Sequence, residues 1–133
     1  MSRLLLDTTF LVDADRSKAS LDELIADDDE VAIAAITMAE LLVGALLADT
    51  AHQADRLQFV NEVRNSIPIV AYDTTIAAAH AELLVAVRRR GRPREAHDLI
   101  IAATASATQR EVVTADRSAY EELPGVLVRS HRS

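Results

Sequence analysis

Four carboxylate side chains, Asp7, Glu40, Asp98 and Asp116, lie far apart in the sequence, each after an apolar run or near the start of a helix-like segment. If folding gathers them, their mutual repulsion favours protonation unless cations neutralise the charge. Mg²⁺ and Mn²⁺ bind carboxylate oxygens and keep water molecules for chemistry. The sequence has no cysteine and no apparent Ser-His-Asp arrangement, so a metal-activated water is the better candidate nucleophile.

Each carboxylate also has a purely structural interpretation. Asp7 is a residue type that caps helix N-termini, and Glu40 stands three residues after Thr37, in the spacing of a capping box. Asp98 suits the first turn of a helix, and Asp116 suits the start of a turn. The metal site is favoured because all four fall at one end of the sheet that the elements imply.

Short apolar strands alternate with helices along the chain. The pattern predicts strands at 3–6, 31–35, 67–71, 111–114 and 126–128, and helices at 10–14, 21–26, 38–48, 50–65, 74–90 and 97–109, with a helical turn at 118–122. Thr37 and either Thr74 or Thr75 are the expected helix caps, and Gly91 is the expected stop. Such βαβ units imply an α/β fold with a parallel sheet and helices on both faces, and ligands bind outside the carboxyl ends of its strands.

The composition indicates one domain spanning 1–133. The chain has 133 residues, of which 50% are hydrophobic and 26% charged, enough for one sizeable core. The absence of cysteine excludes disulfides and thiolate metal sites and fits a reducing compartment. The longest apolar stretch, 31–47, is interrupted by Thr37, Glu40 and Gly44, so we expect a cytoplasmic protein with no membrane partner.

The formal net charge of −7 argues against binding polyanions by bulk electrostatics. One basic segment stands against this background, formed by Arg88, Arg89, Arg90, Arg92 and Arg94. Guanidinium groups contact phosphates bidentately, so the segment is a candidate RNA-binding track. The alternative is a solvated helix end that complements its own dipole.

Four segments, 4–13, 36–44, 96–105 and 113–116, carry Leu-Leu-Leu-Asp-Thr-Thr, Thr-Met-Ala-Glu-Leu-Leu, His-Asp-Leu-Ile-Ile-Ala-Ala and Val-Thr-Ala-Asp. In order and spacing they resemble the signatures of PIN-domain ribonucleases, and most closely the VapC-type toxins of bacterial toxin–antitoxin pairs. The resemblance covers essentially the whole chain and implies a three-layer α/β/α sandwich around a short parallel sheet. It also implies a type II toxin, an endoribonuclease that needs Mg²⁺ or Mn²⁺, forms a homodimer and is inhibited by a VapB-like antitoxin.

By matching motif, the catalytic and metal-binding carboxylate positions of that family fall on Asp7, Glu40, Asp98 and Asp116, and its accessory hydroxyl positions on Thr8 and Thr114. One departure is Ala119, where the family often has an acidic residue or histidine before an aromatic residue. Apolar stripes on the helices at 51–65 and 75–90 are the expected dimer or antitoxin contacts.

Three other classes of protein share some of these features. A phosphotransferase of the haloacid dehalogenase type needs a second Asp where this chain has Thr9, and a response-regulator receiver needs a late lysine, whereas Lys18 is the only lysine. The remaining alternative is a catalytically inactive PIN-like scaffold that acts only through a protein partner. All four carboxylates being present argues against that alternative.

Overall fold

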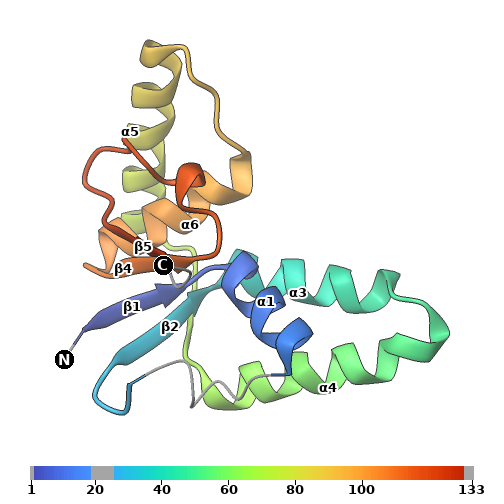
Figure 1. Ribbon diagram of the computed structural model, residues 1–133. Coiled ribbons are helices and arrows are strands. Elements are labelled where there is room, and N and C mark those ends of the chain that lie inside the picture. The colour runs from blue at the N-terminus through green and yellow to red at the C-terminus, as the bar shows by residue number, and fades with distance from the viewer. Residues whose placement is uncertain (1, 19–25, 131–133) are drawn as a thin grey trace.

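The computed structural model describes residues 2–18 and 26–130, and within them five parallel strands form one sheet (Figure 1). The strands are β1 (Arg3–Leu6), β2 (Glu30–Ala34), β3 (Ile69–Val70), β4 (Glu111–Thr114) and β5 (Val128–Ser130), and their order is β3-β2-β1-β4-β5. The first strand is therefore central, paired with β2 on one side and β4 on the other.

Helices connect the strands and cover both faces of the sheet. They are α1 (Thr8–Ser17), α3 (Ala35–Leu47), α4 (Thr50–Ser66), α5 (Thr74–Arg90) and α6 (Ala96–Ala107), and a short 3₁₀ helix, η1 (Arg117–Ala119), follows β4. The helix predicted at 21–26 lies almost wholly outside the described residues. None of the described helices combines the length and apolar character needed to cross a membrane.

Alternating side chains of the central strand divide the core into two halves. Leu5 packs in a cluster with residues of α5 and α6, whereas Leu4 and Leu6 pack in a second cluster with residues of α1, α3 and α4. This alternation follows from the period of two along a strand. Figure 1 shows the same division, with α5 and α6 on one side of the sheet and α1, α3 and α4 on the other. The three-layer α/β/α sandwich is confirmed.

Two predicted helix caps are wrong. The helix predicted at 38–48 begins earlier, at Ala35, without a side-chain cap, so Thr37 does not cap it and the capping box does not form. Thr37 is instead fully buried. The cap of α5 is Asp73, whose side chain accepts a hydrogen bond from the Ile76 backbone N–H, and neither Thr74 nor Thr75 takes that role.

Two edge strands also differ from the prediction. Ile67 caps the C-terminus of α4 through its backbone N–H and is buried in the core, so only Ile69–Val70 remain for β3. At the other edge, Gly125 has a φ of +73°, a turn conformation that glycine adopts without strain. Because that turn precedes the strand, β5 begins at Val128, two residues later than predicted.

Candidate metal centre

The four predicted carboxylates lie around the carboxyl ends of the central strands. Asp7 directly follows β1, and Asp116 comes two residues after β4. Glu40 is on α3, which follows β2, and Asp98 is in the first turn of α6. Parallel sheets bind ligands at the carboxyl ends of their strands, and the four carboxylates lie at that edge.

The electrostatics of Asp98 show that these side chains converge. Burial and then the negative charges of Glu95, Asp7, Glu40 and Asp116, in that order of importance, together raise the pKa of Asp98 to about 6. A first-turn acid alone would have its pKa lowered by the helix dipole. The opposite direction shows that burial and gathered negative charge dominate at this position.

Asp7 caps α1, and its negative charge also acts on Asp98. Its side chain is 2% exposed. Oδ1 accepts hydrogen bonds from the Phe10 backbone N–H at 2.9 Å and the Thr9 hydroxyl at 2.8 Å, and Oδ2 accepts one from the Tyr120 hydroxyl at 2.9 Å. Three donors thus hold the carboxylate in one orientation.

Tyr120 was not predicted as a site residue. It is almost fully buried, and burial, followed by the charge of Asp7, raises the pKa of its phenol far above the ordinary value of 10.0. The hydroxyl therefore stays protonated and acts as a donor to Asp7. Its position after the Val-Thr-Ala-Asp segment, in a chain with only two tyrosines, was the signal available in the sequence.

Glu40 bridges two elements instead of completing a capping box. Oε1 accepts a hydrogen bond from the Thr8 hydroxyl at 2.7 Å, and Oε2 lies 3.3 Å from His97 Nδ1. Thr8, predicted as an accessory hydroxyl, thus contacts one of the four carboxylates directly.

Hydroxyl groups also hold the loop after β4. The Thr114 hydroxyl accepts a hydrogen bond from the Asp116 backbone N–H at 2.9 Å and lies 3.1 Å from the Thr9 hydroxyl. The Ser118 hydroxyl donates to Asp116 Oδ1 at 2.6 Å. Asp116 therefore starts a turn, as the sequence predicts, and the Ser118 hydroxyl within that turn holds its side chain. Thr9 and Ser118 were both missed from the sequence.

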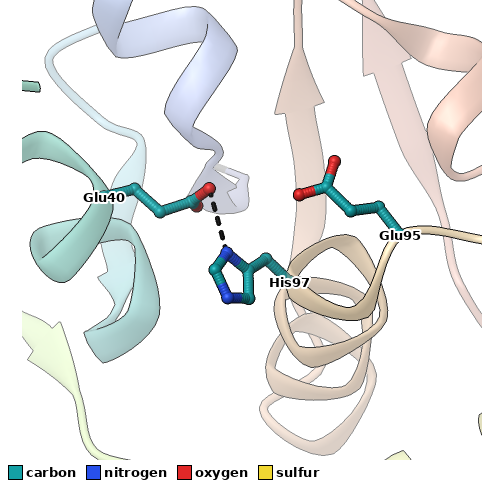
Figure 2. A group of neighbouring side chains, drawn as sticks. All are labelled: Glu40, Glu95 and His97. Carbon is teal, nitrogen blue, oxygen red and sulfur yellow. Dashed lines mark hydrogen bonds and ion pairs between the residues drawn. The ribbon is translucent and has the colours of Figure 1, made fainter. Parts of the chain in front are cut away.

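Glu95 and His97 add two further donor groups beside Glu40. One ligand atom from each of these three side chains lies within 4.8 Å of the other two. Figure 2 shows Glu40 reaching from α3 and His97 from the start of α6, while the Glu95 carboxylate faces them from the residue before that helix. Glu95 belongs to no motif in the sequence, so only the fold reveals its position.

The donor set fits a hard divalent cation. Within residues 2–18 and 26–130, no lysine or arginine forms an ion pair with Asp7, Glu40, Asp98 or Asp116, and His97 is the one basic partner, at Glu40. Burial, followed by these negative charges, raises the pKa of Asp98. Carboxylate oxygens are the ligands that Mg²⁺ and Mn²⁺ prefer, although among the described residues only the ligand atoms of Glu40, Glu95 and His97 lie within 4.8 Å of one another.

Three of the five arginines predicted to bind RNA contact the chain itself. Arg90 donates to the Glu122 carbonyl, Arg92 pairs with the Glu122 carboxylate at 2.8 Å, and Arg94 donates to the Glu121 carbonyl at 2.9 Å. These contacts fasten the segment directly after Tyr120. The remaining two, Arg88 and Arg89, are exposed in the last turn of α5.

Comparison with known proteins gives consistent matches over nearly the full length. The PIN domain matches residues 4–124. A protein named Ribonuclease VapC5 from Mycobacterium tuberculosis is 35% identical over 114 residues, which cover 84% of this chain and 81% of that protein.

Two solved structures have a similar fold. VapBC-5 from Mycobacterium tuberculosis, a member of the VapBC family of toxin–antitoxin systems, matches with a TM-score of 0.80 and 30% identity, covering 98% of this chain and 99% of the other. VapBC2 from Rickettsia felis, bound to a DNA fragment from their promoter, matches with a TM-score of 0.87, covering 96% and 98%. At 20% identity, the latter likeness concerns the fold alone. With this fold and these matches, the chain belongs to the PIN-domain family.

Proposed function

We propose that this protein is the toxin of a type II toxin–antitoxin pair and that it cleaves RNA internally with Mg²⁺ or Mn²⁺. PIN nucleases depend on divalent metal ions, and a relative at 35% identity carries the name ribonuclease. The observation that carries the proposal is that Asp7, Glu40 and Asp116 all act on Asp98. Burial and the charges of Glu95 and of these three residues raise the pKa of Asp98 to about 6.

Asp7, Asp98 and Asp116 are the residues that would hold the cation, with Glu40 completing the set or accepting a proton. When bound, a divalent cation lowers the pKa of water and neutralises charge on a phosphodiester. The protein fixes its ligands in advance, because Tyr120, Thr9 and the Phe10 backbone N–H leave Asp7 a single orientation. We expect products with a 5′-phosphate and a 3′-hydroxyl; a 2′,3′-cyclic phosphate would contradict this chemistry.

A VapB-like antitoxin is the protein partner that we propose. A groove of about 410 Å³ runs between α1, α3 and α4, and Glu40 lies in its lining with Leu41, Phe59 and Arg56. An occupant of this groove would therefore reach the metal centre. The solved VapBC-5 structure, a member of a toxin–antitoxin family, supports a partner of this kind.

A homodimer and a cytoplasmic location belong to the same proposal. The apolar surface differs from the prediction, because no large apolar side chain of α4 is among the exposed ones, whereas Val43, Leu46 and Leu47 of α3 and Val85 of α5 are exposed. Contacts between subunits or with the antitoxin are therefore better sought on α3 and α5. The cysteine-free sequence fits the cytoplasm.

Asp7→Asn tests the enzymatic part of the proposal. Asparagine caps a helix about as well as aspartate, so the fold should survive, while the loss of a charged ligand should reduce RNA cleavage by about 100-fold or more. The measurement is cleavage of RNA by the purified protein with Mg²⁺. The matched control is Asp55→Asn, on an exposed position of α4, which should cleave like wild type.

The other outcomes discriminate between functions. If neither wild type nor Asp7→Asn cleaves any RNA although both are folded, the inactive-scaffold alternative replaces the nuclease. If Asp7→Asn cleaves as well as wild type, the metal centre described above does not perform the reaction.

A further inference from the structure

Tyr120 lies in a stretch of chain, residues 120–127, that belongs to no helix or strand. Turn hydrogen bonds hold its backbone, among them the bond from the Leu123 N–H to the Tyr120 carbonyl at 3.3 Å. Core packing holds the Tyr120 ring, but a shift of the backbone would still move its hydroxyl away from Asp7 Oδ2, which lies at 2.9 Å. The orientation of Asp7 therefore depends on what else fixes this stretch.

Glu122, two residues after Tyr120, has a strained backbone. Its φ is +65°, a left-handed conformation that residues with a side chain adopt only at a cost. Lys18 and Gln109, the other non-glycine residues with positive φ among those described, lie at the C-terminal ends of α1 and α6, where this conformation is common. Glu122 follows no α-helix, and such strain persists where the surroundings impose it.

Three arginines of the basic segment supply the contacts that hold this backbone. Arg90 donates to the Glu122 carbonyl, Arg92 pairs with the Glu122 carboxylate at 2.8 Å, and Arg94 donates to the Glu121 carbonyl at 2.9 Å. Both the main chain and the side chain of Glu122 are thus held from one segment. We call these three arginines, together with residues 121 and 122, the arginine clamp.

The clamp lies at the surface and not in the core. The side chains of Arg92 and Glu122 are 68% and 62% exposed, and together with Arg90 and Leu123 they line an open pocket of about 690 Å³. Exposed ion pairs of this kind contribute little to the free energy of unfolding. A strained residue held by such contacts is better explained by the geometry that they impose on the neighbouring Tyr120.

We propose that the arginine clamp fixes the position of the Tyr120 hydroxyl and that its members are therefore positioning residues of the metal centre at Asp7. They act through Tyr120 and touch neither the cation nor the substrate. The inference deepens the proposed function and rests on it, because the Mg²⁺ that it concerns is the ion that Asp7 would hold.

Isothermal titration of the full-length protein with Mg²⁺, without RNA, tests the clamp by the direction of an effect. Arg92→Ala should weaken Mg²⁺ binding by about two- to fivefold, the amount that an exposed ion pair can supply. The loss of a nearby positive charge would by itself strengthen the binding of a cation, so the two explanations predict opposite changes. Unchanged or stronger Mg²⁺ binding in Arg92→Ala overturns the proposal.

The matched control is Arg89→Ala. It removes one positive charge from the same segment, but the Arg89 side chain forms no hydrogen bond or ion pair with another residue in the described ranges. This variant should bind Mg²⁺ at least as tightly as wild type. If Arg89→Ala weakens Mg²⁺ binding as much as Arg92→Ala does, the effect does not come from the contacts of the clamp and the proposal fails.

A double variant tests the route through Tyr120. In a Tyr120→Phe background, Arg92→Ala should not weaken Mg²⁺ binding further, because the hydroxyl through which the clamp acts is already absent. If the effects of the two substitutions add in full, the clamp does not act through Tyr120 and the proposal is wrong.

Glu122→Gly separates positioning from stability. Glycine adopts a positive φ without strain, so this variant should unfold at a urea concentration no lower than that of wild type. It lacks the carboxylate that Arg92 holds, so Mg²⁺ binding should still weaken by about two- to fivefold. If Mg²⁺ affinity stays at the wild-type value, or falls only together with stability, Glu122 has a structural role alone.

The failure of this inference is distinguishable from the failure of the proposed function. RNA cleavage with wild-type Mg²⁺ affinity in Arg92→Ala removes the clamp and leaves the ribonuclease standing. Weakened Mg²⁺ binding in Arg92→Ala, in a protein that cleaves no RNA, supports the clamp and removes the ribonuclease. A wild-type protein that binds no Mg²⁺ overturns both.

Discussion

Asp98 is the residue at which burial and the gathered negative charge oppose folding. Its pKa in the folded chain is about 6, above the ordinary value of 3.8, so the folded state takes up this proton at a higher pH than the unfolded state. Without metal, the contribution of Asp98 to the free energy of unfolding therefore increases as pH falls through about 6 and levels off near 3.8.

Asp98→Asn should remove this pH dependence. In the presence of EDTA at neutral pH, the variant should be more stable than wild type, and the difference should shrink towards zero at a pH of about 4, where Asp98 is protonated in the folded state. Urea unfolding of both proteins at the two pH values measures this difference in the free energy of unfolding. Equal stability at neutral pH would show that the charges near Asp98 are neutralised by other means.

Tyr120 is a positioning residue, because it acts on the reaction only through Asp7. Tyr120→Phe removes the hydroxyl that donates to Asp7 Oδ2 and leaves the ring in the core. Loss of such an outer-shell donor should weaken Mg²⁺ binding by about 10-fold or more, and the fold should lose roughly 1.5–3 kcal/mol. Isothermal titration with Mg²⁺ measures the first effect, which a purely structural tyrosine would not show.

The control for this variant is Tyr72→Phe, since Tyr72 is exposed and bonds to His80 away from the centre. Unchanged Mg²⁺ affinity in Tyr120→Phe would assign the orientation of Asp7 to Thr9 and the Phe10 backbone N–H alone.

At the scale of elements, we expect the basic segment at the end of α5, residues 88–94, to have two roles that can be separated. Arg94 donates to the Glu121 carbonyl, whereas Arg89 forms no hydrogen bond or ion pair with another residue in the described ranges. Arg94→Ala should therefore lower the free energy of unfolding by about 1 kcal/mol. Arg89→Ala should leave stability unchanged and reduce the slope of log K for RNA against log salt by about 1.

Thermal unfolding and RNA binding at several salt concentrations measure both effects. If Arg94→Ala instead has a smaller slope of log K for RNA against log salt and unchanged stability, Arg94 contacts phosphate as the sequence predicts.

Some elements follow directly from the sequence, and others depend on contacts that no local pattern contains. The apolar runs that form β1 and β4 are bounded by polar residues, and both strands match their predicted ranges. The predicted start of α3 is wrong. Thr37 and Glu40 have the spacing of a capping box, but in the folded chain Thr37 is buried and Glu40 accepts a hydrogen bond from the Thr8 hydroxyl. Tertiary packing outweighed the local signal.

The site residues divide in the same way. Carboxylates that follow strands could be predicted to share one edge of the sheet, because the rule concerns topology. Glu95 could not be predicted, since its nearness to Glu40 depends on how α6 packs relative to α3. The role of Tyr120 likewise depends on a contact with Asp7 over a sequence separation of 113 residues.

At the scale of the whole molecule, the hairpin of α3 and α4 extends away from the sheet (Figure 1), and α3 presents apolar side chains to solvent. Leu46 is 64% exposed and Leu47 is 81% exposed. Exposed apolar groups beside a groove indicate a protein contact. We therefore expect Leu47→Lys to weaken inhibition by the antitoxin by about tenfold or more while RNA cleavage stays at the wild-type level.

Inhibition of RNA cleavage by titrated antitoxin measures this, and Leu127→Lys, another exposed leucine, is the control. If the antitoxin inhibits both variants as strongly as it inhibits wild type, it binds elsewhere on the protein. A change in the sedimentation of Leu47→Lys without antitoxin would assign Leu47 to the homodimer instead.

The central place of β1 determines when during synthesis the protein becomes active. This strand precedes the other four strands in the chain, but it pairs with β4, and Asp7 at its end is held by Tyr120, which is made 113 residues later. Contacts so distant in sequence form only after nearly the whole chain is available. A nascent chain therefore carries an incomplete carboxylate centre until Tyr120 and the loop after β4 have folded.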